Sequence, residues 1–137
     1  MENQRATRAV SIVTRAPLVM TAVIFTLIAS HYLINPVQAG AAAGIAFITP
    51  GGITVARVGF AAFPLTFALI ALRCVVAERR ILSGLYMVVT LVTIVIGVRL
   101  LGMALQHSVE TAKLLVPETA LMGLSLVAIR LERARLK

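Results

Sequence analysis

Four side chains that could bind charged or hydrogen-bonding groups interrupt the apolar stretches of this chain: His31, Arg57, Arg99 and Glu118. An arginine inside an apolar span needs a partner, and its guanidinium matches the geometry of a carboxylate or a phosphate. Glu118 is the only acid well placed to pair, so it must serve Arg57, Arg99 or both. The arginine in excess would suit an anionic or polar headgroup, or a carbonyl-bearing lipid or quinone.

Depth along the expected helices brings these four residues to one level. Counted from the inner helix ends at about 1.5 Å per residue, the four depths are about 27 Å for Arg99, 24 Å for Arg57, 21 Å for His31 and 18 Å for Glu118. All lie in the outer half of a hydrocarbon core about 30 Å thick. Three secondary polar candidates lie just above: Tyr32, Asn35 and Gln106.

Three interpretations of this cluster remain open. It is a buried ion-pair network that holds the helices in register, a ligand-binding pocket, or a set of arginines that extend independently to the outer interface. We expect Arg99 and Glu118 to lie within hydrogen-bonding reach of each other. The third and fourth helices are consecutive in the chain, and such helices are usually antiparallel neighbours.

Catalytic and metal chemistry finds no support in the sequence. The chain has no Asp, and Cys74 is its only cysteine. No phosphate-binding glycine loop, paired carboxylates, serine elbow or metal-ligand spacing occurs. His31 lies in a span but His107 is expected to begin a loop, and nothing in the sequence places them at one depth on facing helices, which argues against haem. We therefore expect no catalytic residue, no metal and no cofactor, and we lean towards a protein that is not an enzyme.

The composition is that of a membrane protein. Of the 137 residues 60% are hydrophobic and 13% charged, and the mean hydropathy is +1.00. A soluble domain carries roughly a quarter charged residues. The net charge of +8 could indicate a nucleic-acid partner. However, the arginines lie at helix ends, and few aromatic residues lie between them. They are better explained as topology signals and as contacts to anionic lipid headgroups.

Four apolar spans are expected, at about 17–34, 53–77, 81–106 and 114–129. Residues 1–16 are a basic segment, either a short amphipathic surface helix or a frayed tail, and 131–137 is a basic C-terminal tail. Pro17 suits the first turn of the first helix, and Asn35-Pro36 ends it. A cleaved signal peptide is the competing interpretation of the first span, but the apolar run is longer than is usual for one.

Two further segments carry structural signals. Residues 37–50 are apolar but short, which is typical of an outer loop or an interfacial half-helix, and they contain the helix-contact pattern Gly40-x-x-x-Gly44. Gly51-Gly52 should break the chain before the second span. Pro64 lies in the middle of that span and leaves the carbonyl of Phe60 without its helical donor, so a kink is expected there.

Lysine and arginine counts predict the orientation. If both termini are cytoplasmic, ten Lys and Arg residues lie on the inner side, and Lys113 alone lies in an outer loop. This asymmetry follows the positive-inside rule. The expected fold is thus an all-α, four-helix transmembrane bundle with short loops, a multi-pass protein of the inner (cytoplasmic) membrane.

The order of the polar marks resembles that of a known family. His31-Tyr32-x-x-Asn35-Pro36 ends the first helix, Arg57-x-Gly59 opens the second, Gly97-x-Arg99 lies late in the third, and Glu118 lies early in the fourth. This pattern resembles the bacterial four-helix membrane family catalogued as domain of unknown function 4345, over about residues 17–130. A looser similarity is to the DoxX-like membrane proteins. Both resemblances imply a small integral membrane protein, and neither implies a reaction.

Two functions from different classes follow from these observations. The chain is a non-enzymatic subunit or accessory protein whose helix faces contact a membrane-protein partner or a second copy. Alternatively, it binds or transports a small anionic, polar or lipidic molecule in the outer-half cluster.

Overall fold

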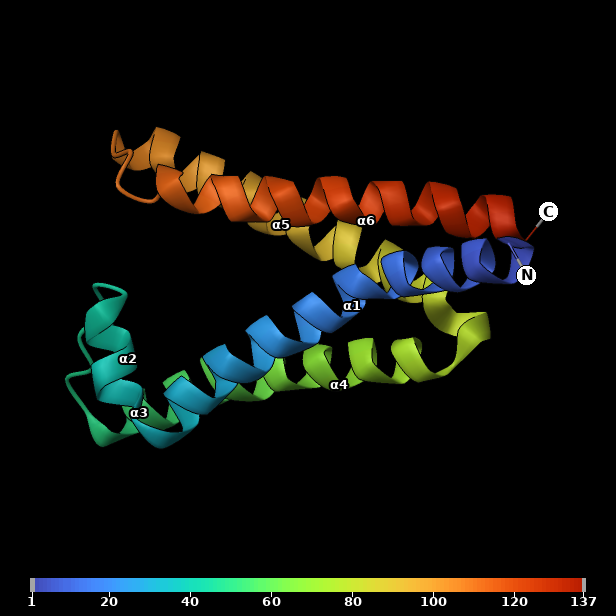
Figure 1. Ribbon diagram of the computed structural model, residues 1–137. Coiled ribbons are helices and arrows are strands. Elements are labelled where there is room, and N and C mark those ends of the chain that lie inside the picture. Colours follow the sequence, from blue (N-terminus) through green and yellow to red (C-terminus); the bar gives the residue numbers. More distant parts are fainter. Residues whose placement is uncertain (1, 137) are drawn as a thin grey trace. The chain divides into compact units, whose positions relative to one another are not determined.

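The computed structural model describes the backbone of residues 2–136 and the side chains of residues 10–136. Every regular element in this part of the chain is a helix, so the predicted all-α class is confirmed. The elements in order are α1 (Glu2–Ile34), α2 (Pro36–Ala42), α3 (Pro50–Arg57), the π-helical turn η1 (Val58–Ala62), α4 (Phe63–Val76), the 3-10 turn η2 (Glu78–Arg80), α5 (Ile81–Gln106), the 3-10 turn η3 (Ala112–Leu114) and α6 (Leu115–Arg135) (Figure 1).

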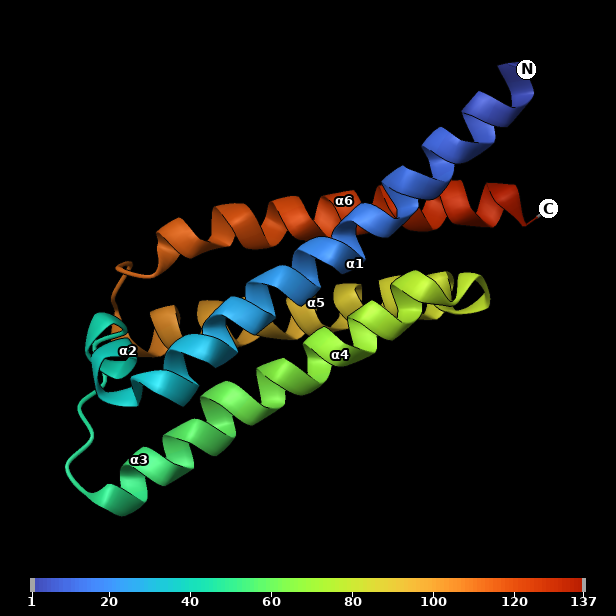
Figure 2. The ribbon, with the colours of Figure 1, turned by 60° about the horizontal axis from the view of Figure 1, so that its bottom comes forward.

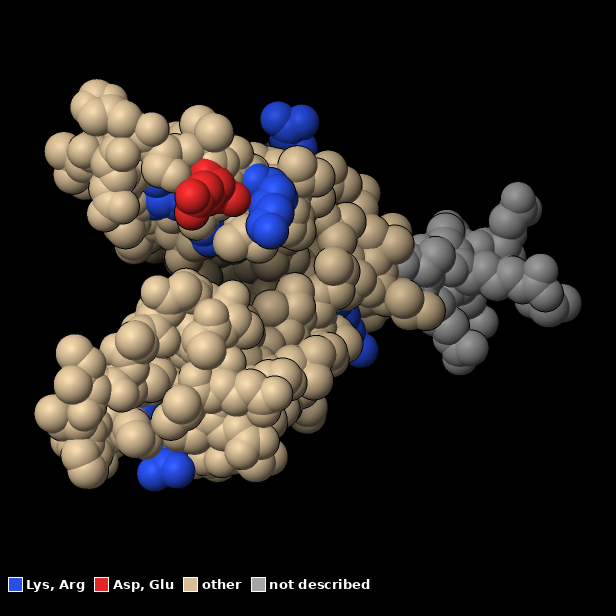
Figure 3. All heavy atoms as spheres, turned by 90° about the vertical axis from the view of Figure 1, so that its left-hand side faces the viewer, with Lys and Arg blue, Asp and Glu red and all other residues tan. Residues whose placement is uncertain are grey.

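Within the described residues, four helical stretches are long and apolar enough to cross a membrane: Val10–Ile34, Pro50–Val76, Glu78–Gln106 and Ala112–Arg135. Many of their large apolar side chains are exposed. The face drawn in Figure 3 likewise carries only a few charged groups among uncharged atoms. Exposed apolar surface of this extent belongs in lipid. The chain is therefore a multi-pass membrane protein of the predicted four-helix class.

The helices form two compact units. Unit 1 combines Met1–Leu18 with Cys74–Lys137, and unit 2 is Val19–Arg73. The helix α1 contributes its first part to unit 1 and its second part to unit 2, and α4 is divided in the same way near its end.

Unit 1 is built on the antiparallel pair α5 and α6, which lie side by side in both views (Figures 1 and 2). Its core is a cluster of buried apolar side chains: Leu18, Cys74, Ile81, Leu85, Val88, Val92, Ala128 and Ile129. Gly84 permits the closest approach, because a Cβ at this position would lie 2.6 Å from the Cβ of Cys74 and 3.0 Å from Cδ2 of Leu18. The start of α1, the end of α4 and α5 therefore meet at a point where only glycine fits.

Unit 2 packs the second part of α1 against α3, η1 and α4. The rings of Phe25 and Phe67 meet edge to face at 6.2 Å between centroids, and Tyr32 lies 4.9 Å from Phe60. Ala29 on α1 is 3% exposed, and small residues at such positions let membrane helices approach closely. The unit is thus held by aromatic pairs and alanine contacts.

The first helix is longer than the sequence predicts. It begins at Glu2, so Pro17 lies inside it and not in its first turn. Pro17 is fully buried. A proline inside a membrane helix is tolerated where neighbouring groups satisfy the freed backbone. Residues 2–16 of the basic segment are therefore continuous with the first span, and neither a separate surface helix nor a frayed tail describes them.

Two expectations for the glycines near the second span are wrong. Gly51 and Gly52 lie inside the first turn of α3, because the Thr49 side chain accepts a hydrogen bond from the Gly52 N–H at 3.1 Å and caps the helix. The pattern Gly40-x-x-x-Gly44 is not a helix face either. The helix α2 ends at Ala42, and Gly44 has a φ of +74° in the following turn. Gly40 instead makes room for the ring of Phe47.

A π-helical turn lies beside Pro64, and the kink expected there stays a prediction. The turn η1 ends two residues before Pro64, and the Phe63 N–H donates to the carbonyl of Val58, five residues back. Because Pro64 has no N–H to offer the Phe60 carbonyl, the helix loses one bond of its ladder there. A local π-turn is a known way for a helix to accommodate such a break.

The fourth helix also extends beyond the expected 114–129 span. It runs from Leu115 to Arg135 and so includes most of the segment expected to be a basic tail. Its buried residues, Ser125, Ala128, Ile129 and Glu132, follow helical spacing along one face. Packing of this face is what keeps the last two turns helical.

Candidate functional site

Arg99 and Glu118 form a two-point ion pair in unit 1. The Arg99 Nε donates to Oε2 of Glu118 at 3.0 Å, and its terminal NH2 nitrogen donates to Oε1 at 2.5 Å. The side chains are only 20% and 18% exposed. Paired guanidinium and carboxylate groups in this geometry are among the stronger polar contacts in proteins. The contact predicted from the sequence is confirmed.

The hairpin positions the pair. Arg99 lies on α5 seven residues before Gln106, the last residue of that helix, and Glu118 lies in the first turn of α6. An acid at this position also faces the positive end of the helix dipole. His107 turns the chain after α5 with a left-handed φ of 49°. The Glu118 carboxylate is therefore bound by Arg99 and lies where the helix dipole favours a negative charge.

Arg57 has a different partner. Its Nε donates to the backbone carbonyl of Leu33 at 3.3 Å. Leu33 is the second-last residue of α1, and the last carbonyls of a helix lack intrahelical donors. Among the described side chains, no carboxylate lies within ion-pairing distance of Arg57. Arg57 thus caps α1 with one N–H and keeps its remaining donors available.

An apolar groove of about 280 Å³ runs beside Arg57 within unit 2. Its lining comes from α1 and from the α3–η1–α4 helix: Ala29, Ser30, Leu33, Thr54, Arg57, Val58, Ala61, Ala62 and Leu65. Arg57 is the only charged residue of this lining. The groove therefore combines an apolar wall with a single positive charge.

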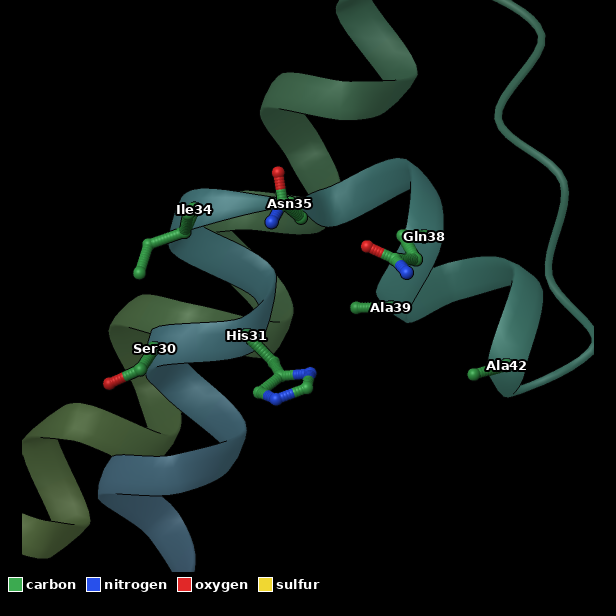
Figure 4. Close-up of a pocket in the computed structure, with 7 residues that line it drawn as sticks. All are labelled: Ser30, His31, Ile34, Asn35, Gln38, Ala39 and Ala42. Carbon is green, nitrogen blue, oxygen red and sulfur yellow. The ribbon is translucent and has the colours of Figure 1, made fainter.

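A second, more polar pocket of about 290 Å³ lies between the end of α1 and α2 (Figure 4). The His31 ring and the Gln38 amide point towards the space between the two helices, with Ala39 and Ala42 on the α2 side, whereas Ser30 and Ile34 point away from His31. Asn35 also contributes to the lining. Asn35-Pro36 creates this pocket, because it ends α1 and turns the chain into α2.

The remaining secondary candidates have local roles. Tyr32 stacks on Phe60 of η1 and so packs the π-helical turn. Gln106 is exposed at the end of α5. Neither residue contributes to the groove or to the α1–α2 pocket.

The expected four-residue cluster divides between the two units. Unit 1 contains Arg99 and Glu118, which pair, and unit 2 contains His31 and Arg57. His31 and Arg57 line different hollows of unit 2, which share Ser30. A single site that contains all four residues stays a prediction.

A second charged network was not anticipated. At the other end of unit 1, Glu78 of η2 pairs with Arg15 of α1 at 3.1 Å and lies 4.0 Å from Arg135 of α6. Arg135 also pairs with Glu132 at 2.7 Å, and Glu132 is 1% exposed. The spacing of Glu132 from Ser125 and Ala128 could have revealed that it faces the core. It was missed because the surrounding charges suggested a solvated tail.

Metal ligation is not a feature of the described residues, since no three His, Cys, Asp or Glu side chains come together there. Cys74 is buried against Gly84 and packs the core. No model of a known protein family, no curated protein and no solved structure matches the chain.

Proposed function

We propose that the chain is a small, non-enzymatic protein of the inner membrane that binds an anionic, lipid-like molecule in the groove beside Arg57. The observation that carries this proposal is the contrast between the two arginines. Arg99 is fully paired with Glu118, whereas Arg57 donates to one backbone carbonyl and faces no acid among the described side chains. A charge in an apolar span is costly unless it is compensated, and an anionic ligand would compensate Arg57.

The groove suggests the chemical class of the ligand. Its apolar wall, with Ala29, Leu33 and Leu65, suits a hydrocarbon chain, and the guanidinium suits a phosphate or carboxylate. The polar pocket with His31, Asn35 and Gln38 lies on the neighbouring face of α1 and offers uncharged hydrogen-bonding groups. A lipid with a negative head and further polar substituents would use both features.

Placement in the inner membrane with cytoplasmic termini is part of this proposal. The ten-to-one distribution of Lys and Arg supports it. The network of Arg15, Glu78 and Arg135 also brings the first helix, the α4–α5 turn and the end of α6 to one end of unit 1. The resemblance to the family of domain of unknown function 4345 belongs to the proposal as well.

Extraction of bound lipid from the purified protein tests the binding function. Arg57→Ala should lower the amount of co-purifying anionic lipid about tenfold, the effect of losing one strong charge-assisted contact. Arg73→Ala is the matched control, because Arg73 is an exposed arginine of the same unit outside the groove. Equal lipid content in the wild type and both variants would refute binding at Arg57.

An accessory role is the second candidate, and the open glycines favour it. A Cβ at Gly97 or Gly102 of α5, or at Gly123 of α6, would meet nothing within 4 Å. Glycines on lipid-facing helix surfaces are typical of contacts with partner helices. Blue-native electrophoresis after mild solubilisation should then show a complex with a partner or a second copy. A monomer under every detergent condition would contradict this candidate.

A further inference from the structure

The end of α6 carries an open basic hollow that is separate from the outer-half residues. Arg130, Arg133, Ala134 and Leu136 line it. Arg130 and Arg133 are three residues apart and therefore lie on the same face of the helix. Both side chains are exposed.

Arg133 is held in place by Tyr86 near the start of α5. Its terminal NH2 nitrogen donates to the Tyr86 hydroxyl oxygen, and its guanidinium carbon lies 5.6 Å from the centre of the tyrosine ring. A cation over an aromatic face is stabilised without being neutralised. Arg133 is thus oriented in advance and keeps its full charge.

The two acids of the charged network at this end of unit 1 already have arginine partners. Glu132 is buried and pairs with Arg135, and Glu78 pairs with Arg15. Among the described residues, no carboxylate lies within ion-pairing distance of Arg130 or Arg133. Two unneutralised guanidiniums side by side form a site for an anion with several oxygens, such as a phosphate.

The same face of α6 becomes apolar one turn closer to the membrane centre. Leu126 and Val127, four and three residues before Arg130, are 46% and 51% exposed, and Gly123 leaves open space before them. The combination of a basic end and an exposed apolar face is the pattern of a phospholipid lying along a helix. A free phosphate has no hydrocarbon chain that could contact the apolar part of this face.

We infer that the end of α6 is a headgroup site for an anionic phospholipid, with Arg130 and Arg133 on the phosphate and Tyr86 as the positioning residue for Arg133. In the proposed orientation this end of α6 lies in the cytoplasmic leaflet. The lipid binding itself depends neither on that orientation nor on the groove at Arg57. A lipid here would anchor the last turns of α6 at the membrane surface.

Native mass spectrometry of the whole protein in detergent, titrated with phosphatidylglycerol, tests the site. Arg130→Ala/Arg133→Ala should weaken the first binding step about 25-fold, or about fivefold for each arginine. Arg79→Ala/Arg80→Ala removes two exposed arginines of η2 and is the charge-matched control, expected to change binding less than about twofold. Tyr86→Phe, which keeps the ring and removes the hydroxyl, should weaken binding about threefold.

Three outcomes would overturn the inference. Equal losses in the two double variants would show non-specific attraction to charge. Competition by millimolar inorganic phosphate would show an anion site without lipid. Full binding by Arg130→Ala/Arg133→Ala would show that the lipid lies elsewhere.

Arg130→Lys/Arg133→Lys keeps the charge and guards against a folding defect, and it should retain part of the affinity. The same titration on the Arg57→Ala background, where the groove no longer holds lipid, should show the same loss on Arg130→Ala/Arg133→Ala, so a failure here is distinguishable from a failure of the groove.

Discussion

The guanidinium of Arg99 holds both carboxylate oxygens of Glu118, with the Nε nitrogen 3.0 Å from one and the terminal NH2 nitrogen 2.5 Å from the other. This pair lies near the loop end of the α5–α6 hairpin. Each partner would be an uncompensated charge without the other, so the pair should be more costly to break than to remove.

Glu118→Gln should therefore destabilise the protein in detergent by about 2 kcal/mol, because Arg99 then faces a neutral amide. Arg99→Leu combined with Glu118→Leu should recover much of that loss. Thermal unfolding of the wild type, Arg99→Leu, Glu118→Leu and the double variant gives the coupling free energy. Losses that simply add in the double variant would rule out an energetic link between the two side chains.

Gly84→Ala should destabilise unit 1 by about 1–3 kcal/mol, because the new methyl group collides with Cys74 and Leu18. The same exchange at Gly97, on the same helix but in open space, should be neutral or stabilise the isolated protein by up to about 1 kcal/mol. Thermal unfolding of both variants measures the difference. If Gly84→Ala were as stable as Gly97→Ala, the close approach of α1, α4 and α5 would be wrong.

Glu132→Ala should cost about 3 kcal/mol, because it leaves a cavity in the core and deprives Arg135 of its nearest acid. Glu110→Ala is the matched control, because Glu110 is exposed in the α5–α6 loop and loses the same atoms on substitution. Glu110→Ala should alter stability by no more than about 0.5 kcal/mol. Chemical or thermal unfolding measures the stability of the two variants. If Glu132→Ala and Glu110→Ala had similarly small effects, Glu132 would not be part of the core.

Features that depend on neighbouring residues and on consecutive helices were predictable from the sequence. The uncharged run before Arg99 predicts the third span, and the antiparallel arrangement of consecutive helices predicts the pairing of Arg99 with Glu118. The structure has both. The end of α1 at Asn35-Pro36 followed in the same way from the missing N–H of proline.

Tertiary packing explains what the sequence did not reveal. Pro17 is compatible with a helix start, and only its burial shows that the helix passes through it. Arg57 binds a backbone carbonyl, and a pattern of side chains in the sequence cannot predict a partner of that kind. Glu132 carries a charge that suggested solvent, although it faces the core.

Reporter fusions should place the C-terminus and the loop at residues 108–113 on opposite sides of the membrane. The loop contains Lys113 as its only Lys or Arg, whereas the α4–α5 turn and the end of α6 are rich in arginine. A phosphatase and a fluorescent protein, active on opposite sides, give complementary signals. The same side for both positions would exclude a membrane crossing by α6.

Arg57 is proposed to be available to a ligand, whereas Arg99 is held by Glu118. Native mass spectrometry of the anionic lipid retained by Arg57→Ala and by Arg99→Leu/Glu118→Leu compares the two arginines. Arg57→Ala should lose the lipid about tenfold, and the double variant should retain it at the wild-type level. Loss of the lipid in the double variant, with retention in Arg57→Ala, would show that Arg57 does not hold it.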